Sequence, residues 1–166
     1  MNLHRADVGI CICALVFIFV LWHSAYMDPS IVTLHAVEPL PYVVGPLLCL
    51  RGKKFGYALS FSAGAFWLLS AGLLTSFVRN GFQQLGVLLS TGTMPRPDIL
   101  IAVPAALSTG GLALFALVGY FHLPKRRPAD VALFLLAAAA VILFFLLIFK
   151  LFAPKFLGMF RRILPK

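Results

Sequence analysis

Charged residues are scarce in this chain, and acidic residues are the scarcest. Only 11% of its 166 residues are charged, with 5 Asp and Glu in total, whereas 61% are hydrophobic and the mean hydropathy is +1.00. A soluble domain of this size needs a much more polar surface, so this composition requires lipid as the solvent. Because roughly 20 apolar helical residues cross a bilayer core about 30 Å thick, the chain has room for about five spans and for no separate soluble catalytic domain.

The signatures of several enzyme and cofactor classes are also missing. The sequence has no Gly-rich phosphate loop, no Gly-x-Ser-x-Gly and no His-Glu-x-x-His. Cys11, Cys13 and Cys49 form no Cys-x-x-Cys pair, which a quinone-linked thiol oxidoreductase needs. His23 and His122 are haem-ligand types, but a five-span topology puts them near opposite surfaces and only a four-span topology brings them to one side. We therefore expect no metal and no other cofactor, and the sequence favours a protein that is not an enzyme.

Five apolar runs are long enough to cross a bilayer. The first follows a short basic head, as in a signal peptide, but no small-x-small cleavage site comes after it, so we expect a retained span. The second is the least regular, because Glu38 and three prolines interrupt it; it is either a kinked span or a re-entrant or interfacial segment. The sequence thus predicts an all-α, polytopic transmembrane helix bundle with five spans, or with four spans and one such segment. The runs are residues 8–27, 31–50, 55–78, 99–123 and 131–152.

The remaining segments are expected to stay at the membrane surface. Residues 82–89 are apolar but too short to cross, so they are expected to rest at the interface. Residues 153–166 alternate basic and apolar side chains, which is typical of a basic interfacial tail. We expect residues 1–166 to form a single integral membrane domain.

Basic residues are in excess, with 14 Lys and Arg and a formal net charge of +9. On a soluble surface this excess would indicate a nucleic-acid partner, but here the basic residues gather between and after the apolar runs. Anionic head groups lie at that depth, so the lipid bilayer is the expected partner of the basic loops and no nucleic acid is expected. The clusters are Arg51, Lys53 and Lys54; Lys125, Arg126 and Arg127; and Lys155, Arg161, Arg162 and Lys166.

The distribution of these clusters bears on orientation. Positive residues in short loops prefer the cytoplasm. With five spans and the N-terminus inside, seven basic residues lie inside and six outside if Lys150 is counted within the last helix, and a four-span topology gives a similar balance. The short clustered loops favour a cytoplasmic N-terminus in a multi-pass protein of the cell (plasma) membrane, and the count does not separate the two topologies.

One group of polar residues stands out as a candidate site. The five-span topology brings His23, Asp28, His35 and Glu38 toward one outer mouth around the first loop. These are ligand types for transition metals and partners in proton relays. His35 and Glu38 share a helical face if their stretch is helical, although Pro39 disturbs that geometry. The plainer interpretation makes His23 an interface anchor and Glu38 a helix cap, and Glu38 is still the residue we single out.

Small residues recur at every fourth position in the third and fourth runs, for example Ser60 with Gly64 and Ala102 with Ala106 and Gly110. Such faces let helices approach closely, either inside one chain or between partners.

Two functions follow from these features. The favoured one is a non-enzymatic subunit or accessory component of a membrane complex, which packs against other membrane subunits or against itself. The alternative is a small oligomeric transporter or channel that uses Glu38 with His35 or His23. The position of Glu38 separates them, because a place in the wall of a polar cavity favours transport and a place on the surface removes the main argument for it.

Overall fold

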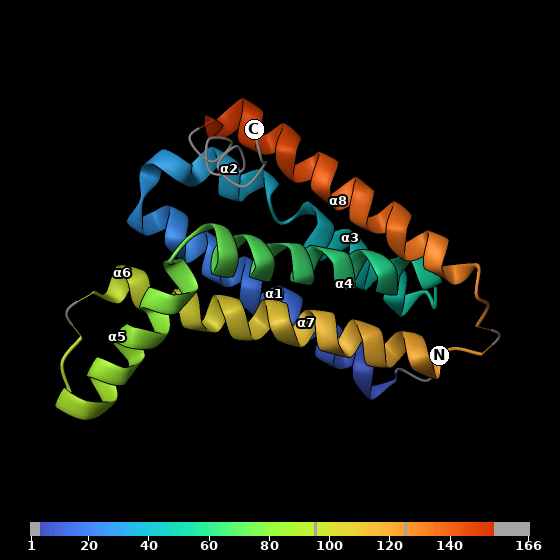
Figure 1. The fold of residues 1–166 in the computed structure, drawn as a ribbon, viewed down its shortest axis with the longest axis horizontal. Coiled ribbons are helices and arrows are strands. Elements are labelled where there is room, and N and C mark those ends of the chain that lie inside the picture. Colours follow the sequence, from blue (N-terminus) through green and yellow to red (C-terminus); the bar gives the residue numbers. More distant parts are fainter. Residues whose placement is uncertain (1–3, 95, 125, 155–166) are drawn as a thin grey trace.

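The computed structural model describes residues 4–94, 96–124 and 126–154, and this part of the chain is helical without any strand. Five helical segments are long and apolar enough to cross a membrane. Their N- and C-terminal ends alternate between the two ends of an elongated bundle (Figure 1). The predicted all-α bundle with five candidate spans is therefore confirmed. The segments are Arg5–Met27, Pro29–Leu50, Lys54–Leu73, Pro97–His122 and Asp130–Phe152.

The first segment is the single helix α1 (Arg5–Met27), which starts with a capping box. The His4 side chain accepts a hydrogen bond from the backbone N–H of Ala6, and the Asp7 carboxylate accepts one from the backbone N–H of His4. This reciprocal cap satisfies donors that the first helical turn leaves unpaired.

The second segment is a broken helix, made of η1 (Pro29–Ile31), α2 (Val32–Val37) and α3 (Leu40–Leu50). The break falls at Glu38 and Pro39, since Pro39 and Pro41 have no N–H to donate to the carbonyls four residues earlier. A helical second run is what the five-span topology expects, and the structure adds that Glu38 lies at the interruption.

The third run does not continue as a helix to residue 78. Helix α4 (Lys54–Leu69) passes into the π-helical turn η2 (Ser70–Leu74) and stops at Thr75, whose backbone is extended. The Thr75 hydroxyl donates to the carbonyl of Ala71 and accepts from the N–H of Phe77, and so closes one helix and starts the next. The span is thus shorter than residues 55–78, because side-chain capping and not hydropathy sets its end.

The last helices are α5 (Phe77–Thr91), α6 (Pro97–Leu100), α7 (Ala102–His122) and α8 (Asp130–Phe152). Helix α5 leaves the bundle at one end and ends at Gly92, whose φ of 69° closes the helix in a left-handed cap (Figure 1). At Gly81, α5 lies so close to α7 that a Cβ would come within 2.7 Å of the Ala102 Cβ. The expectation that residues 82–89 rest at a membrane interface stays a prediction, and the tail from residue 155 lies outside the described residues.

Small residues are used for packing inside the chain. A Cβ at Gly64 of α4 would lie 2.5 Å from the carbonyl oxygen of Thr109 in α7, and one at Gly111 would lie 2.7 Å from the sulfur of Cys13 in α1. These contacts let α7 pack closely against both α1 and α4 in the centre of the bundle. The small residue Gly64 is thereby explained without a partner.

The two ends of the bundle have different characters, and we name them by position. The N-terminal end holds the starts of α1, α4 and α8 and the ends of α3 and α7; the cavity end holds the opposite termini together with α5 and α6 (Figure 1).

Candidate functional site

A cavity of about 660 Å³ lies at the cavity end of the bundle. Its walls come from α1, α2, α4, η2, α5, α6, α7 and α8, so helices distant in sequence meet around it. Its volume falls in the range of about 300–1,000 Å³ that is usual for small-molecule sites. The described lining is mainly apolar, and six aromatic rings contribute: Phe17, Phe66, Trp67, Phe77, Phe145 and Phe149.

Glu38 lines this cavity from the break between α2 and α3 and is only 4% exposed. Its carboxylate oxygen Oε2 lies 3.5 Å from Nε2 of His35, one helical turn earlier. Within the described part of the chain, this ion-pair contact is the one polar contact of the Glu38 carboxylate. The buried carboxylate therefore has little protein compensation for its charge.

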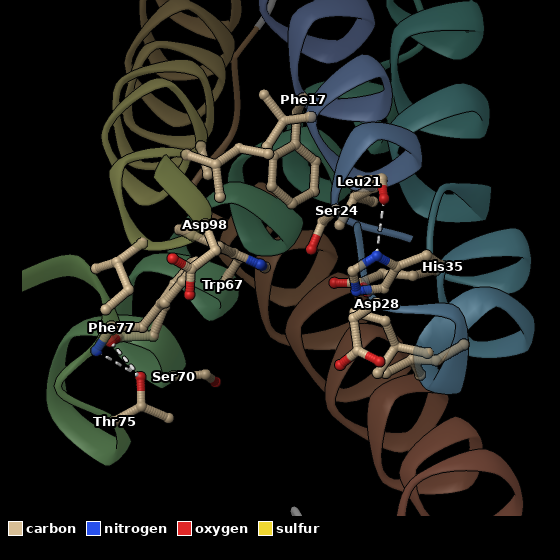
Figure 2. Close-up of a pocket in the computed structure, with 18 of the residues that line it drawn as sticks. Phe17, Leu21, Ser24, Asp28, His35, Trp67, Ser70, Thr75, Phe77 and Asp98 are labelled. Carbon is tan, nitrogen blue, oxygen red and sulfur yellow. Dashed lines mark hydrogen bonds and ion pairs between the residues drawn. The ribbon is translucent and has the colours of Figure 1, made fainter. Parts of the chain in front are cut away.

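The hydrogen bonding of His35 fixes which of its ring nitrogens can exchange a proton. Nδ1 lies 2.8 Å from the carbonyl oxygen of Leu21, as the dashed line in Figure 2 marks. Because a carbonyl only accepts, we assign the proton to Nδ1. Nε2 is then the atom that gains or loses a proton, and this atom faces Glu38.

This arrangement limits the charge states of the pair. An isolated carboxylate in a buried site is costly, whereas one beside a cation is stabilised. The Glu38 charge is balanced when the carboxyl itself is protonated, when His35 Nε2 is protonated, or when a cation occupies the cavity. The pair can therefore exchange a proton for a positively charged ligand.

Two further carboxylates stand at the rim of the cavity. Asp28 ends α1 and caps η1, with Oδ1 accepting from both the N–H and the hydroxyl of Ser30 at 3.0 and 2.7 Å. Asp98 of α6 accepts two hydrogen bonds from Arg96, and this pair is about half exposed. Asp98 lies across the cavity from Asp28 and His35 (Figure 2).

The structure brings together three of the four residues that the sequence suggested. Asp28, His35 and Glu38 all line the cavity. His23 does not; its ring is exposed and stacks on Phe19 with the ring centroids 6.4 Å apart. Among the described residues no group of three His, Cys, Asp or Glu side chains is placed to hold a metal.

Sequence reasoning missed Asp98 and the aromatic wall. Asp98 precedes the fourth apolar run after a polar connection, and its approach to the first loop depends on how α6 folds back onto the bundle. A polar residue at the start of an apolar run is a weak signal, because interfacial carboxylates are common. The aromatic residues were unremarkable within apolar runs.

A second polar cluster, also missed, holds the N-terminal end together. Asp130 accepts hydrogen bonds from Lys54 at 2.5 Å, from Tyr120 at 2.9 Å and from the N–H of Arg127 at 3.0 Å. Asp7 accepts from the hydroxyl of Tyr57 at 2.7 Å. Asp130 has three protein donors and Asp7 has two, so we interpret this cluster as a structural clasp that joins the helices and not as a site.

No protein-family model, curated protein or solved structure matches the chain. The function is therefore argued from the cavity and from the residues that line it.

Proposed function

We propose that this multi-pass membrane protein binds a small solute in the cavity and transports it, with Glu38 as the binding carboxylate and His35 as its proton-exchange partner. The observation that carries the proposal is the position of Glu38, a buried carboxylate at a helix break that faces a cavity of ligand size. Ionisable residues within membrane segments are costly, so they are kept mainly where they serve a function.

The broken second segment supports transport more than packing. Transporters commonly form their sites at interrupted helices, where the backbone leaves the regular helix and faces a cavity. The cavity reaches in from one end, and Phe17 in its wall and Tyr42 of α3 are fully buried in the core. Passage to the other end therefore requires these helices to rearrange around the bound solute, as alternating access does.

The accessory-subunit hypothesis stays a prediction, and part of the small-residue pattern behind it is used inside the chain. Gly64, one of the small residues that fitted a partner or a contact inside the chain, faces another helix of the same chain. The transport hypothesis keeps its support, since Glu38 lines a cavity. An oligomer would add walls to a slim bundle, which suits the same function.

The test is a solute screen on the purified full-length protein. Thermal stability in detergent is measured with defined classes of solute, namely organic amines, carboxylates, sugars and nucleosides, for wild type, Glu38→Gln and His23→Gln. A bound solute raises the melting temperature by mass action. We expect one class to stabilise wild type and His23→Gln but not Glu38→Gln, because His23 lies outside the cavity lining.

Transport is then measured with that solute in proteoliposomes. Wild type should give a flux above that of empty liposomes, and Glu38→Gln should lower it to the background. If no class stabilises wild type, or if the stabilising class is insensitive to Glu38→Gln, the proposed site is wrong. Binding without flux would leave a receptor or sensor in place of a transporter and would refute the transport step.

A further inference from the structure

We infer that the ligand of this cavity is an organic cation with an apolar, aromatic-compatible body. The inference rests on the proposed function and adds the chemical class of the solute. It comes from how the few acidic residues are distributed, from the aromatic wall and from the unmet charge of Glu38.

The distribution of charge around the cavity is opposite to that of the chain. The protein carries 5 acidic residues against 14 basic ones, and Asp28, Glu38 and Asp98 all line this one cavity. The described lining contains no Lys or Arg. Carboxylates facing a low-dielectric space focus a negative potential there, which attracts cations and repels anions.

Depth separates the roles of the three carboxylates. Asp28 and Asp98 are exposed at the rim and already accept hydrogen bonds from nearby protein groups, so they attract a cation without holding it strongly. Glu38 is buried and lacks a hydrogen bond from the described residues. A cation that reaches Glu38 gains a strong interaction, because among the described residues this carboxylate has only the His35 ring, at 3.5 Å, as a charge partner.

The remaining lining selects an apolar body. Trp67 and five phenylalanine rings surround the space, and the faces of aromatic rings attract cations such as quaternary ammonium or phosphonium groups. A small hydrated metal ion would gain little from this wall, and the described residues offer no metal-ligand cluster. An organic cation satisfies both the carboxylate and the rings.

Two hydrophobic ions of nearly equal shape and opposite charge give a direct test. Tetraphenylphosphonium is the cationic probe, and tetraphenylborate is its anionic counterpart. Binding is followed by the fluorescence of Trp67 in the full-length Trp22→Phe protein, since the chain contains 2 tryptophans. The converse variant, Trp67→Phe, keeps Trp22, which is 61% exposed and outside this cavity, and it reports probe dissolved in the detergent.

We expect tetraphenylphosphonium to change Trp67 fluorescence saturably, whereas tetraphenylborate changes it no more than it changes Trp22 fluorescence. Glu38→Gln should lower the affinity for tetraphenylphosphonium by about tenfold or more, since it removes one partner of a buried charge pair. Glu38→Asp, which keeps the charge, should recover part of the affinity. Equal binding of both probes, or cation binding unaffected by Glu38→Gln, would overturn the inference.

Variants at the rim should move the affinity in opposite directions. Asp98→Asn should lower the affinity for tetraphenylphosphonium about twofold. Arg96→Gln should raise that affinity by about the same factor, because loss of Arg96 releases Asp98 from its exposed ion pair. A general loss of structure would weaken binding in both variants. Weakening by Arg96→Gln would therefore count against the electrostatic argument.

The same chemistry occurs in lipids with an ammonium head group. The ligand could therefore be a lipid head group or a solute from water. Titrating phosphatidylcholine against bound tetraphenylphosphonium, with phosphatidylglycerol as the control, separates these two sources. Competition by phosphatidylcholine alone indicates that the ligand is a lipid head group. If neither lipid competes, the ligand is a dissolved cation. Both results support a cation site. Competition by phosphatidylglycerol alone would overturn it. If the solute screen finds a sugar or carboxylate that depends on Glu38, this inference fails and the proposed function survives.

Discussion

Replacing Gly64 with alanine tests the closest approach between helices in the centre of the bundle. A Cβ at this position of α4 would lie 2.5 Å from the carbonyl oxygen of Thr109 in α7. Because this oxygen belongs to the backbone, no change of rotamer relieves the clash, and the two helices must separate by about 1 Å to restore ordinary contact. Overpacking of this kind costs about 1–3 kcal/mol.

The measurement is thermal unfolding in detergent, with Gly86→Ala as the matched control. A Cβ at Gly86 of α5 would meet nothing within 4 Å. Both variants gain the same helix propensity, so the difference between them reports the clash. At about 2–4 °C per kcal/mol for a chain of this size, Gly64→Ala should melt about 2–12 °C below the control. Equal melting temperatures would refute the reasoning, since α4 and α7 would then not be in backbone contact.

Two other changes probe the helix contacts near the N-terminal end. Tyr57→Phe removes the hydroxyl that donates to Asp7 at 2.7 Å, and it should lower the free energy of unfolding by about 1–3 kcal/mol in a denaturant titration; an unchanged midpoint would show that Asp7 finds another donor. Gly45→Ala should lower the melting temperature because its Cβ would lie 2.5 Å from the Ser60 hydroxyl oxygen, and Ser60→Ala in the same chain should recover part of the loss. If the double variant is no more stable than Gly45→Ala, the hydroxyl is not the obstacle.

The number of candidate spans could be predicted because it depends on run length and hydropathy, which are local properties. An interruption near Glu38, in a kinked span or in a re-entrant or interfacial segment, could be predicted because Pro39 and Pro41 remove backbone donors wherever they lie. The end of the third span was not foreseen. Hydropathy stays high to residue 78, and the chain turns at Thr75 because of a side-chain cap that hydropathy does not register.

The candidate site was predictable only in part, for the same reason. The spacing of His35 and Glu38 is local, so their contact followed once the stretch was helical. The cavity itself depends on how α4, α6 and α8 approach α2, and no short-range pattern carries that information. Asp98 and Trp67 therefore entered the site only with the structure.

The two ends of the bundle differ in the interactions that must break when their helices move. At the N-terminal end, Asp130 joins α8 to Lys54 of α4 and to Tyr120 of α7, so that three helices are tied by one carboxylate. At the cavity end, α5 extends from the bundle (Figure 1), and Asp28, Glu38 and Asp98 line the cavity. Opening at the cavity end must move α5 against α7, which contact through Gly81 and Ala102, whereas movement at the other end must also break the hydrogen bonds of Asp130 to Lys54 and Tyr120.

Cysteine labelling of the full-length chain tests the topology on which the transport proposal depends. Single cysteines at Ser30 and Thr93 should react with an impermeant maleimide from one side of the membrane, and those at Lys53 and Arg127 from the other. All four positions are exposed; Lys53, Thr93 and Arg127 lie between candidate spans and Ser30 lies in the first turn of the second one, so burial does not confound the result. If Ser30 and Lys53 react from the same side, the second segment does not cross the membrane. Glu38 would then leave the membrane interior, its burial cost would fall, and the argument for a cation held within the bilayer would lose its physical basis.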